Sequence, residues 1–343
     1  MASVAQLDHL LPEEIAATSS EYPGFNLHVS RRAFITGIAG QDGSYLAEFL
    51  LGRDYEVSGL VRHTTDVARS HLAGIASQLK LHRGDLADHA AVQAVVAASS
   101  PDEIYHLAAQ SHVAEAERDP SNTLRQNVLG TLHLLEAARK QSTPPRFFHA
   151  STAQIFGQPD QEPQDESTPV RPMNLYGVSK VLATRLVQTW RKDLGLFAVN
   201  GILFNHESPR RGSEFVTAKI CKAAAAIRAG RQKELHLGDI TTLRDWGDAR
   251  EFVEGFWRAL QAPRPDDYVF ATGKLHSVEQ LLDLAFGAVQ LNWRDFVRTD
   301  PTLFRRAEAK RMVGNPAKAA RELGWIPQKP FAELIREMVA AAS

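Results

Sequence analysis

The chain has 343 residues, of which 44% are hydrophobic, and a formal net charge of -1 at pH 7. This length allows one large core or two unequal cores, and the charge gives no global field that favours nucleic acid or an anionic membrane. Its single cysteine, Cys221, excludes an internal disulfide bond and fits a reducing compartment. No apolar run approaches the ~18 residues of a membrane-spanning helix, and no basic leader is present, so we expect a cytoplasmic protein.

Residues 1–30 precede the first expected strand. Leu7, Leu10, Leu11 and Ile15 recur there at helical spacing, which indicates a short amphipathic helix that docks on the body or on another subunit. A plain tail without function is the alternative. We treat this segment as an N-terminal extension.

Short apolar runs alternate with helical stretches in the first half, the pattern of an α/β fold with a doubly wound parallel sheet. Strands are expected at residues 33–36, 56–61, 79–82, 103–108, 146–150, 197–204 and, returning from the C-terminal half, 267–272. A helix is expected over 215–229, and the capping-box form that starts at Ser277 predicts another through Phe286. We assign 31–205 to a Rossmann-type cofactor domain and 206–343 mainly to a smaller α/β substrate domain.

A glycine-rich turn lies between the first strand and the helix after it, the context in which such a motif binds a dinucleotide. Its glycines Gly37, Gly40 and Gly43 allow the backbone to approach a pyrophosphate, and Gln41 and Asp42 complete the turn. The N-terminus of the helix adds free N–H groups and the positive end of its dipole. We therefore expect these five residues to hold the cofactor diphosphate, with a structural tight turn as the alternative.

The second strand is followed by Arg62, where an NAD enzyme usually places an acidic residue on the ribose 2′-hydroxyl. A guanidinium beside hydroxyl groups suits a 2′-phosphate, so NADP is favoured over NAD, although a solvated loop arginine is the alternative. Asp85 follows the third strand and is placed to accept from the adenine amino group. The remaining expected cofactor contacts follow the third and fourth strands: Leu86, Leu107, Ala108 and Ala109.

Tyr176 and Lys180 are four residues apart and lie on one face of the expected helix. A phenol titrates near pH ~10, and a nearby ammonium together with a cationic nicotinamide ring lowers that pKa. Such a tyrosine can take a proton from a sugar hydroxyl while hydride leaves the carbon. The pair alone is usually a plain helix surface, but the glycine turn and the stretch from Ser151 to Gln154 after a buried strand strengthen the catalytic interpretation.

Several blocks of the sequence resemble the GDP-mannose 4,6-dehydratase family: residues 37–51, 108–113, 197–212 and 244–247, residues 271–273 with 276–278, and residues 315–319 with 323–325. The resemblance runs from Arg32 to the C-terminus. That family belongs to the extended short-chain dehydrogenase/reductases, so the resemblance implies bound NADP, a GDP-sugar substrate, a role in carbohydrate biosynthesis and a homo-oligomer, either dimer or tetramer. It implies no metal, and no Cys/His cluster in the sequence suggests one.

The resemblance also implies individual roles. Thr152 would hydrogen-bond the sugar C4 hydroxyl, Tyr176 would remove its proton, and Lys180 would hold the nicotinamide ribose and tune Tyr176. Arg211 would lie in a loop that reaches a neighbouring subunit's cofactor site. The substrate's nucleotide and phosphates would contact Ser111, Asn205, Val216, Lys219, Arg244, Arg305 and Glu308.

The chain departs from the family at one catalytic position. Where the family motif reads Ser-Thr-Ser-Glu-Leu-Tyr-Gly, residues 151–157 read Ser-Thr-Ala-Gln-Ile-Phe-Gly. The family's glutamate takes the C5 proton after C4 oxidation, and the amide of Gln154 cannot, although it can still anchor a hydroxyl. General base catalysis contributes typically ~10²–10⁴-fold, so this loss matters.

We therefore expect transient C4 oxidation followed by return of the hydride to the other face, which is C4 epimerisation without dehydration. Three alternatives stay open: a 4,6-dehydratase whose base is displaced to His112 or Glu207, a 4-keto-sugar reductase, and a non-catalytic binding protein that kept the fold.

Overall fold

The computed structural model describes residues 30–304 and 309–343. Arg31–Ser343 form one compact unit, and the description below concerns that unit. The expected helix around Leu7 and Ile15 lies outside the described residues, as do Arg305 and Glu308.

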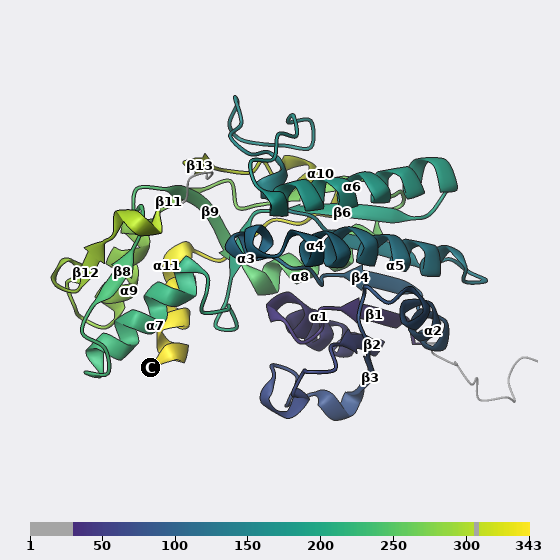
Figure 1. Cartoon of the computed structure of the whole chain (residues 1–343), viewed down its shortest axis with the longest axis horizontal. Helices are drawn as coiled ribbons and strands as arrows, with labels where there is room; N and C mark the ends of the chain where they lie inside the picture. Colours follow the sequence, from purple (N-terminus) through teal and green to yellow (C-terminus); the bar gives the residue numbers. More distant parts are fainter. Residues whose placement is uncertain (1–29, 305–308) are drawn as a thin grey trace, which may run out of the picture. The chain divides into compact units, whose positions relative to one another are not determined.

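Seven parallel strands form the central sheet in the order β3-β2-β1-β4-β5-β6-β10. Figure 1 labels β1, β2, β3, β4 and β6 of this sheet. The bounds of the strands are β1 (Arg32–Thr36), β2 (Glu56–Val61), β3 (Leu79–Arg83), β4 (Glu103–His106), β5 (Arg146–Ala150), β6 (Ala198–Leu203) and β10 (Asp267–Phe270). This confirms the predicted doubly wound fold, and every expected strand is present to within two residues at each end. The strand order reverses between β1 and β4, which is where such sheets bind dinucleotides.

Helices cover both faces of the sheet. Ala33 and Ile35 of β1 belong to the apolar cluster that includes α1 (Gln41–Leu51) and α8 (Ala249–Gln261). Phe34, between them, belongs to the cluster on the other face, because successive strand side chains point to opposite faces. The helices of that other face are α2 (His89–Ser99), α5 (Gly130–Arg139) and α6 (Leu175–Leu194).

Shorter helices connect these elements. Between β4 and α5 lie α3 (Val113–Arg118), α4 (Pro120–Leu124) and the π-helix η3 (Arg125–Leu129). The 3₁₀ turns are η1 (Val67–Arg69), η2 (Ala76–Gln78), η4 (Ala153–Ile155), η5 (Trp293–Asp295) and η6 (Pro301–Leu303).

The C-terminal half adds a second group of elements. A small sheet contains β7 (Asn205–Glu207), β9 (Leu243–Asp248), β11 (Leu275–Ser277) and β13 (Arg311–Met312), and β8 (Leu235–Leu237) pairs with β12 (Val297–Thr299). Three helices pack on one another beside them (Figure 1): α7 (Val216–Arg228), α9 (Val278–Ala288) and α11 (Phe331–Ala342). The last helix, α10 (Ala317–Leu323), packs against β10 and α8.

Local signals in this half are confirmed. The Ser277 hydroxyl accepts from Gln280 N at 3.0 Å, and the Gln280 side chain accepts from Ser277 N at 3.1 Å, which is the predicted capping box at the start of α9. The helix expected over 215–229 is α7. The domain boundary at residue 205 stays a prediction, and β10 supplies the strand that was expected to return to the central sheet.

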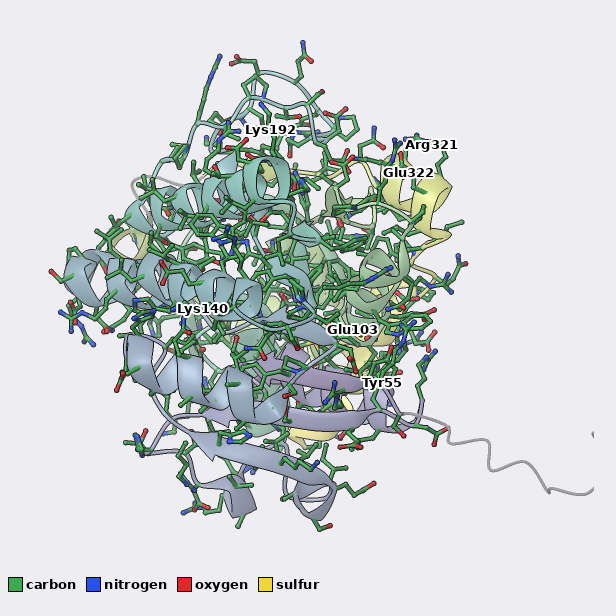
Figure 2. The ribbon with its side chains drawn as sticks, turned by 90° about the vertical axis from the view of Figure 1, so that its right-hand side faces the viewer. Tyr55, Glu103, Lys140, Lys192, Arg321 and Glu322 are labelled. Atoms are coloured by element: carbon green, nitrogen blue, oxygen red, sulfur yellow. The ribbon has the colours of Figure 1, made fainter. Side chains whose placement is uncertain are left out.

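A buried carboxylate lies at the amino ends of the strands. Figure 2 shows Tyr55 and Glu103 together at this edge, where the Tyr55 hydroxyl donates to Glu103 Oε1 at 3.2 Å. Tyr105 and Gln261 also donate to Glu103, at 2.7 Å and 2.9 Å. Because Glu103 begins β4, this network lies at the opposite edge of the sheet from the carboxyl strand ends, where parallel sheets bind ligands.

Candidate active site

The glycine turn has the geometry that a diphosphate requires. Gly37 has φ +73°, and a Cβ there would lie 2.8 Å from Ala108 N. A Cβ on Gly43 would lie 2.2 Å from Gly37 O. The first bond of α1 runs from Ser44 N to Gly40 O at 3.0 Å, so the N–H groups before Ser44 precede the intrahelical ladder. The described residues therefore fit the diphosphate of a dinucleotide at a helix N-terminus.

An ion pair joins this turn to β7. His206 Nε2 lies 2.9 Å from Asp42 Oδ2, and Gln41 Nε2 donates both to Asp42 Oδ1 at 2.9 Å and to His206 O at 3.1 Å. Burial by itself raises the pKa of Asp42 and lowers that of His206. The attraction between the two outweighs burial, so the pKa of Asp42 lies below its usual value and that of His206 above. No sequence motif relates His206 to Asp42, because 164 residues separate the two.

The loop after β7 carries two arginines, and both contact residues of the same chain. Arg210 Nη1 donates to Ser44 Oγ at 2.9 Å, and its Nη2 lies 2.6 Å from Glu48 Oε1. Arg211 Nε lies 3.1 Å from Glu207 Oε2, and the Arg211 guanidinium lies 3.6 Å from the ring centroid of Phe215. The expectation that this loop reaches a neighbouring subunit stays a prediction.

The adenosine end of the expected cofactor site contains Asp85. Its Oδ1 accepts from Ala87 N at 2.9 Å and from Gln126 Nε2 at 2.8 Å. The bond from Ala87, then that from Gln126 and the charges of Arg125 and Arg62, hold the pKa of this carboxyl below its usual value despite partial burial. The charge of Arg62 therefore acts on the carboxyl of Asp85.

The loop that carries Arg62 is fixed by a residue that the sequence analysis missed. Arg83 Nη1 donates to Arg62 O at 3.3 Å, to His63 O at 3.0 Å and to Thr65 O at 3.1 Å. The Arg62 side chain is exposed and available to a phosphate. Leu86 is buried after β3, and Leu107, Ala108 and Ala109 follow β4 as expected.

Thr152 and Tyr176 meet at the carboxyl end of β5. Asn174 caps α6 by accepting from Gly177 N at 2.8 Å, and this places Tyr176 in the first turn of the helix. The Thr152 side chain acts on the Tyr176 phenol in the direction that lowers its pKa. Burial raises the pKa of Tyr176 to about 12, although the Thr152 side chain and the charge of Arg211 act in the lowering direction. The lowering expected from Lys180 together with a bound nicotinamide ring stays a prediction.

Lys180 is buried one turn along α6. Burial lowers the pKa of Lys180 to about 7. Its Nζ lies 3.1 Å from His149 Nε2, a contact that no sequence motif indicated.

Gln154 lies beside the cap of α6. Its Oε1 accepts from Asn174 Nδ2 at 3.4 Å, and its Nε2 lies 3.8 Å from Met312 Sδ. The proposed substitute base, Glu207, is only 2% exposed and is bound by Thr217 as well as Arg211. Glu207 is therefore engaged in structural contacts and does not fit the role of a free base.

The expected substrate residues that are described lie on several elements. Asn205 lies in β7, which pairs with β9, the strand of Arg244. Arg244 is 5% exposed, and its Nη1 donates to Leu243 O at 2.8 Å. Val216 begins α7, and Lys219 Nζ donates to the main chain at His236 O, 2.7 Å away. Ser111 lies between β4 and α3.

The model of the GDP-mannose 4,6 dehydratase family matches residues 34–338. The chain belongs to this family. GDP-mannose 4,6 dehydratase 2 of Arabidopsis thaliana is 44% identical over 319 residues, which cover 90% of this chain and 85% of the relative.

Two solved structures illustrate the fold and its cofactors. RMD from Pseudomonas aeruginosa complexed with NADPH has a TM-score of 0.78 at 28% identity, covering 92% of this chain and 98% of its own. The Thermus thermophilus UDP-glucose 4-epimerase complex with NAD has a TM-score of 0.80 at 27% identity, covering 91% and 98%. The chain is therefore a nucleotide-sugar-modifying short-chain dehydrogenase/reductase with a Rossmann fold.

Two features are absent from the residues that the structure describes. Within 30–304 and 309–343, no helix is long and apolar enough to cross a membrane. In the same two ranges, no three or more His, Cys, Asp or Glu side chains form a group that could hold a metal ion.

Proposed function

We propose that this chain oxidises C4 of a GDP-activated sugar with NADP, and that its net reaction is the 4,6-dehydration of GDP-mannose. The family and the 44% identical Arabidopsis dehydratase support this alternative from the sequence analysis over epimerisation. The observation that carries the chemistry is the placement of Thr152 directly after β5 and of Tyr176 in the first turn of α6, with the Thr152 side chain acting on the pKa of the Tyr176 phenol. Such a pair can hold one sugar hydroxyl and remove its proton.

The chain's own residues would handle the proton. Tyr176, as phenolate, takes the proton of the C4 hydroxyl while the C4–H pair of electrons leaves as hydride. When bound, oxidised NADP supplies the hydride acceptor. Because burial holds the pKa of Tyr176 at about 12, forming the phenolate requires positive charge nearby. Arg211 contributes some, and a charged Lys180 in the next turn adds more.

Gln154 favours epimerisation as a second candidate function. In the dehydratase reaction a base removes the C5 proton and the C6 hydroxyl leaves as water, and an amide cannot act as that base. Without this step, a 4-keto sugar keeps its C6 hydroxyl and can take the hydride back on its other face. Dehydration by this chain would therefore require a base at another position.

Several features support NADP over NAD. Arg62 is exposed, its charge acts on Asp85, and Arg83 donates to the main chain of the loop that carries Arg62. A guanidinium can form bidentate, charge-assisted hydrogen bonds with a 2′-phosphate. The solved neighbours include both an NADPH complex and an NAD complex, so this preference depends on the chain's own residues.

An exposed apolar surface supports a homo-oligomer. The helices α4 and η3 pack against α6. These three helices carry large hydrophobic side chains that are 36% to 46% exposed: Leu124 in α4, Leu129 in η3, and Val178 and Leu182 in α6. A second copy of the chain would remove this surface from water.

Mass spectrometry of the product tests the proposed function. Incubation with NADP and GDP-mannose should yield a 4-keto product lighter by one water. A product of unchanged mass but altered sugar would establish the epimerase instead. Unconsumed GDP-mannose, with conversion of another GDP-sugar in a panel, would overturn the substrate while keeping the C4 chemistry.

A further inference from the structure

A buried histidine contacts the lysine of the candidate active site. His149 lies in β5 and is fully buried, Lys180 lies in α6 and is 2% exposed, and the distance from Lys180 Nζ to His149 Nε2 is 3.1 Å. A buried ammonium needs acceptors for its three hydrogens. His149 can be one of them only if its Nε2 carries no hydrogen.

The neighbours of His149 determine which of its nitrogens is protonated. His149 Nδ1 lies 2.9 Å from Asn200 Oδ1. Asn200 Nδ2 donates to Thr184 O at 3.3 Å and to Asp267 Oδ1 at 2.9 Å. Because both of these partners are acceptors, the amide orientation is set and its oxygen faces His149. Nδ1 of His149 is therefore the donor, and its Nε2 presents a lone pair to Lys180.

The hydrogen bonds that run from Lys180 through His149 and Asn200 end at Asp267, which binds side chains of the same helix as Lys180. Asp267 Oδ1 also accepts from Arg191 Nη1 at 2.8 Å, and Asp267 Oδ2 accepts from Gln188 Nε2 at 2.5 Å. Arg191 and Gln188 lie in α6, whereas His149, Asn200 and Asp267 lie in β5, β6 and β10. This series of hydrogen bonds therefore connects α6 to three adjacent strands and holds the His149 ring in place.

The surrounding charges keep His149 neutral. Burial and then the charges of Lys180 and His106 hold the pKa of His149 well below its usual value. His106 of β4 lies 5.6 Å away between ring centroids, and burial lowers its pKa to about 3. On the active-site side, Tyr176 shares α6, and Arg211 and Asp42 act on its phenol. His149 therefore remains an uncharged acceptor around neutral pH.

We propose that His149 is a positioning residue of the reaction, whose Nε2 lone pair holds the Lys180 ammonium in place and in its charged form. This inference rests on the proposed function only in assigning Lys180 to catalysis. A hydrogen bond to the charged form of a group favours that form. The loss of His149 as an acceptor should therefore lower the pKa of Lys180 and weaken its support of the Tyr176 phenolate.

Two variants distinguish a role of His149 in positioning Lys180 from a role in packing alone. In His149→Gln an amide oxygen can still accept from Lys180, whereas His149→Leu removes the acceptor. We expect His149→Leu to lose about tenfold or more in kcat with little change in KM, the scale of a hydrogen bond to a charged group. The alkaline limb of its pH–rate profile should move to lower pH. His149→Gln should keep kcat within about threefold of the wild type, and the alkaline limb of its pH–rate profile should stay at the wild-type pH.

The proposal is overturned if His149→Leu keeps the wild-type kcat and profile. It is also overturned if both variants are folded by thermal melting and lose activity equally, because that result indicates packing alone.

A second measurement needs neither substrate nor variant stability. In the full wild-type chain with ¹⁵N-labelled histidine, long-range ¹H–¹⁵N spectra should show His149 protonated at Nδ1 and bare at Nε2 across neutral pH. A hydrogen at Nε2, or titration of His149 in that range, would contradict the proposal. If the wild type converts no GDP-sugar, the proposed function fails. The NMR spectra still show whether His149 Nε2 accepts a hydrogen bond from Lys180.

Discussion

His206 Nε2 lies 2.9 Å from Asp42 Oδ2, and this ion pair joins β7 to the first turn of α1. Ser208, two residues further along, donates to Gln41 Oε1 at 2.8 Å. The segment that follows β6 therefore fixes the glycine turn that fits the cofactor diphosphate. The Asp42 side chain is engaged by protein partners, so its expected contribution to cofactor binding would come through the backbone of the turn.

Asp42→Asn should destabilise the protein by about 1.5–3 kcal/mol near pH 6, the scale of a hydrogen bond to a charged group. His206 has a raised pKa, so its stabilisation is complete below pH 6.5 and is lost as pH rises through that raised value. Asp42 has a lowered pKa, so its stabilisation is present above pH 3.8 and is lost as pH falls through that lowered value. Melting temperatures should therefore differ most at pH 5–6, between these values, and converge at alkaline pH. The exposed Asp66→Asn is the control, and a difference that is constant with pH would refute the ion pair.

Tyr176→Phe should lower kcat by about 10²–10⁴-fold, because it removes the group that takes the C4 hydroxyl proton. NADPH affinity should stay within about threefold, since the glycine turn and the Arg62 loop are untouched. Steady-state rates and fluorescence titration check the two parts. Tyr45→Phe is the matched control, because the Tyr45 ring packs under Arg210 and its hydroxyl has no proposed role. A Tyr176→Phe enzyme with normal turnover would exclude Tyr176 as the base.

Gln154→Glu should raise the rate at which the product that has lost one water forms, because it restores a carboxylate where the family's base stands. Mass spectrometry of the GDP-sugar product over time measures that rate. Gln158→Glu, at an exposed position in the same segment, adds the same charge and should leave the rate unchanged. If Gln154→Glu leaves the rate unchanged too, residue 154 does not face C5 of the sugar.

Arg62→Ala should weaken NADPH binding by about 10–100-fold, the equivalent of one or two charge-assisted hydrogen bonds. NADH binding should change little, because NADH carries no 2′-phosphate. Titration of both dinucleotides gives the two affinities, with the exposed Arg69→Ala as the control. An equal loss for both cofactors would show that Arg62 does not read the 2′-phosphate.

Leu182→Arg should shift the protein toward smaller species, because it places a charge in the exposed apolar surface of α4, η3 and α6. Sedimentation velocity over a concentration series detects the shift. Leu194→Arg lies near the end of the same helix and is exposed to a similar degree, 40% against 46%. If both variants assemble like the wild type, this surface does not join copies of the chain.

The local elements of this protein follow from the sequence, because each depends on residues close together in the chain. The alternation of apolar runs predicts the parallel sheet, the glycine turn predicts a strand followed by a helix N-terminus, and the Ser277 capping box predicts the start of α9. The resemblance of the blocks at residues 37–51, 108–113 and 197–212 indicates the family. The NADP preference and the roles of the single site residues go beyond the fold and stay predictions.

Tertiary structure alone decided which polar groups meet and how deeply they are buried. His149 is 31 residues from Lys180 and His206 is 164 residues from Asp42, so no spacing in the sequence relates either pair. Burial also sets the pKa of Tyr176, which rises to about 12 in the chain alone. The energy of a buried charge depends on the partners and solvent that surround it, and these are set only when distant segments of the chain pack together.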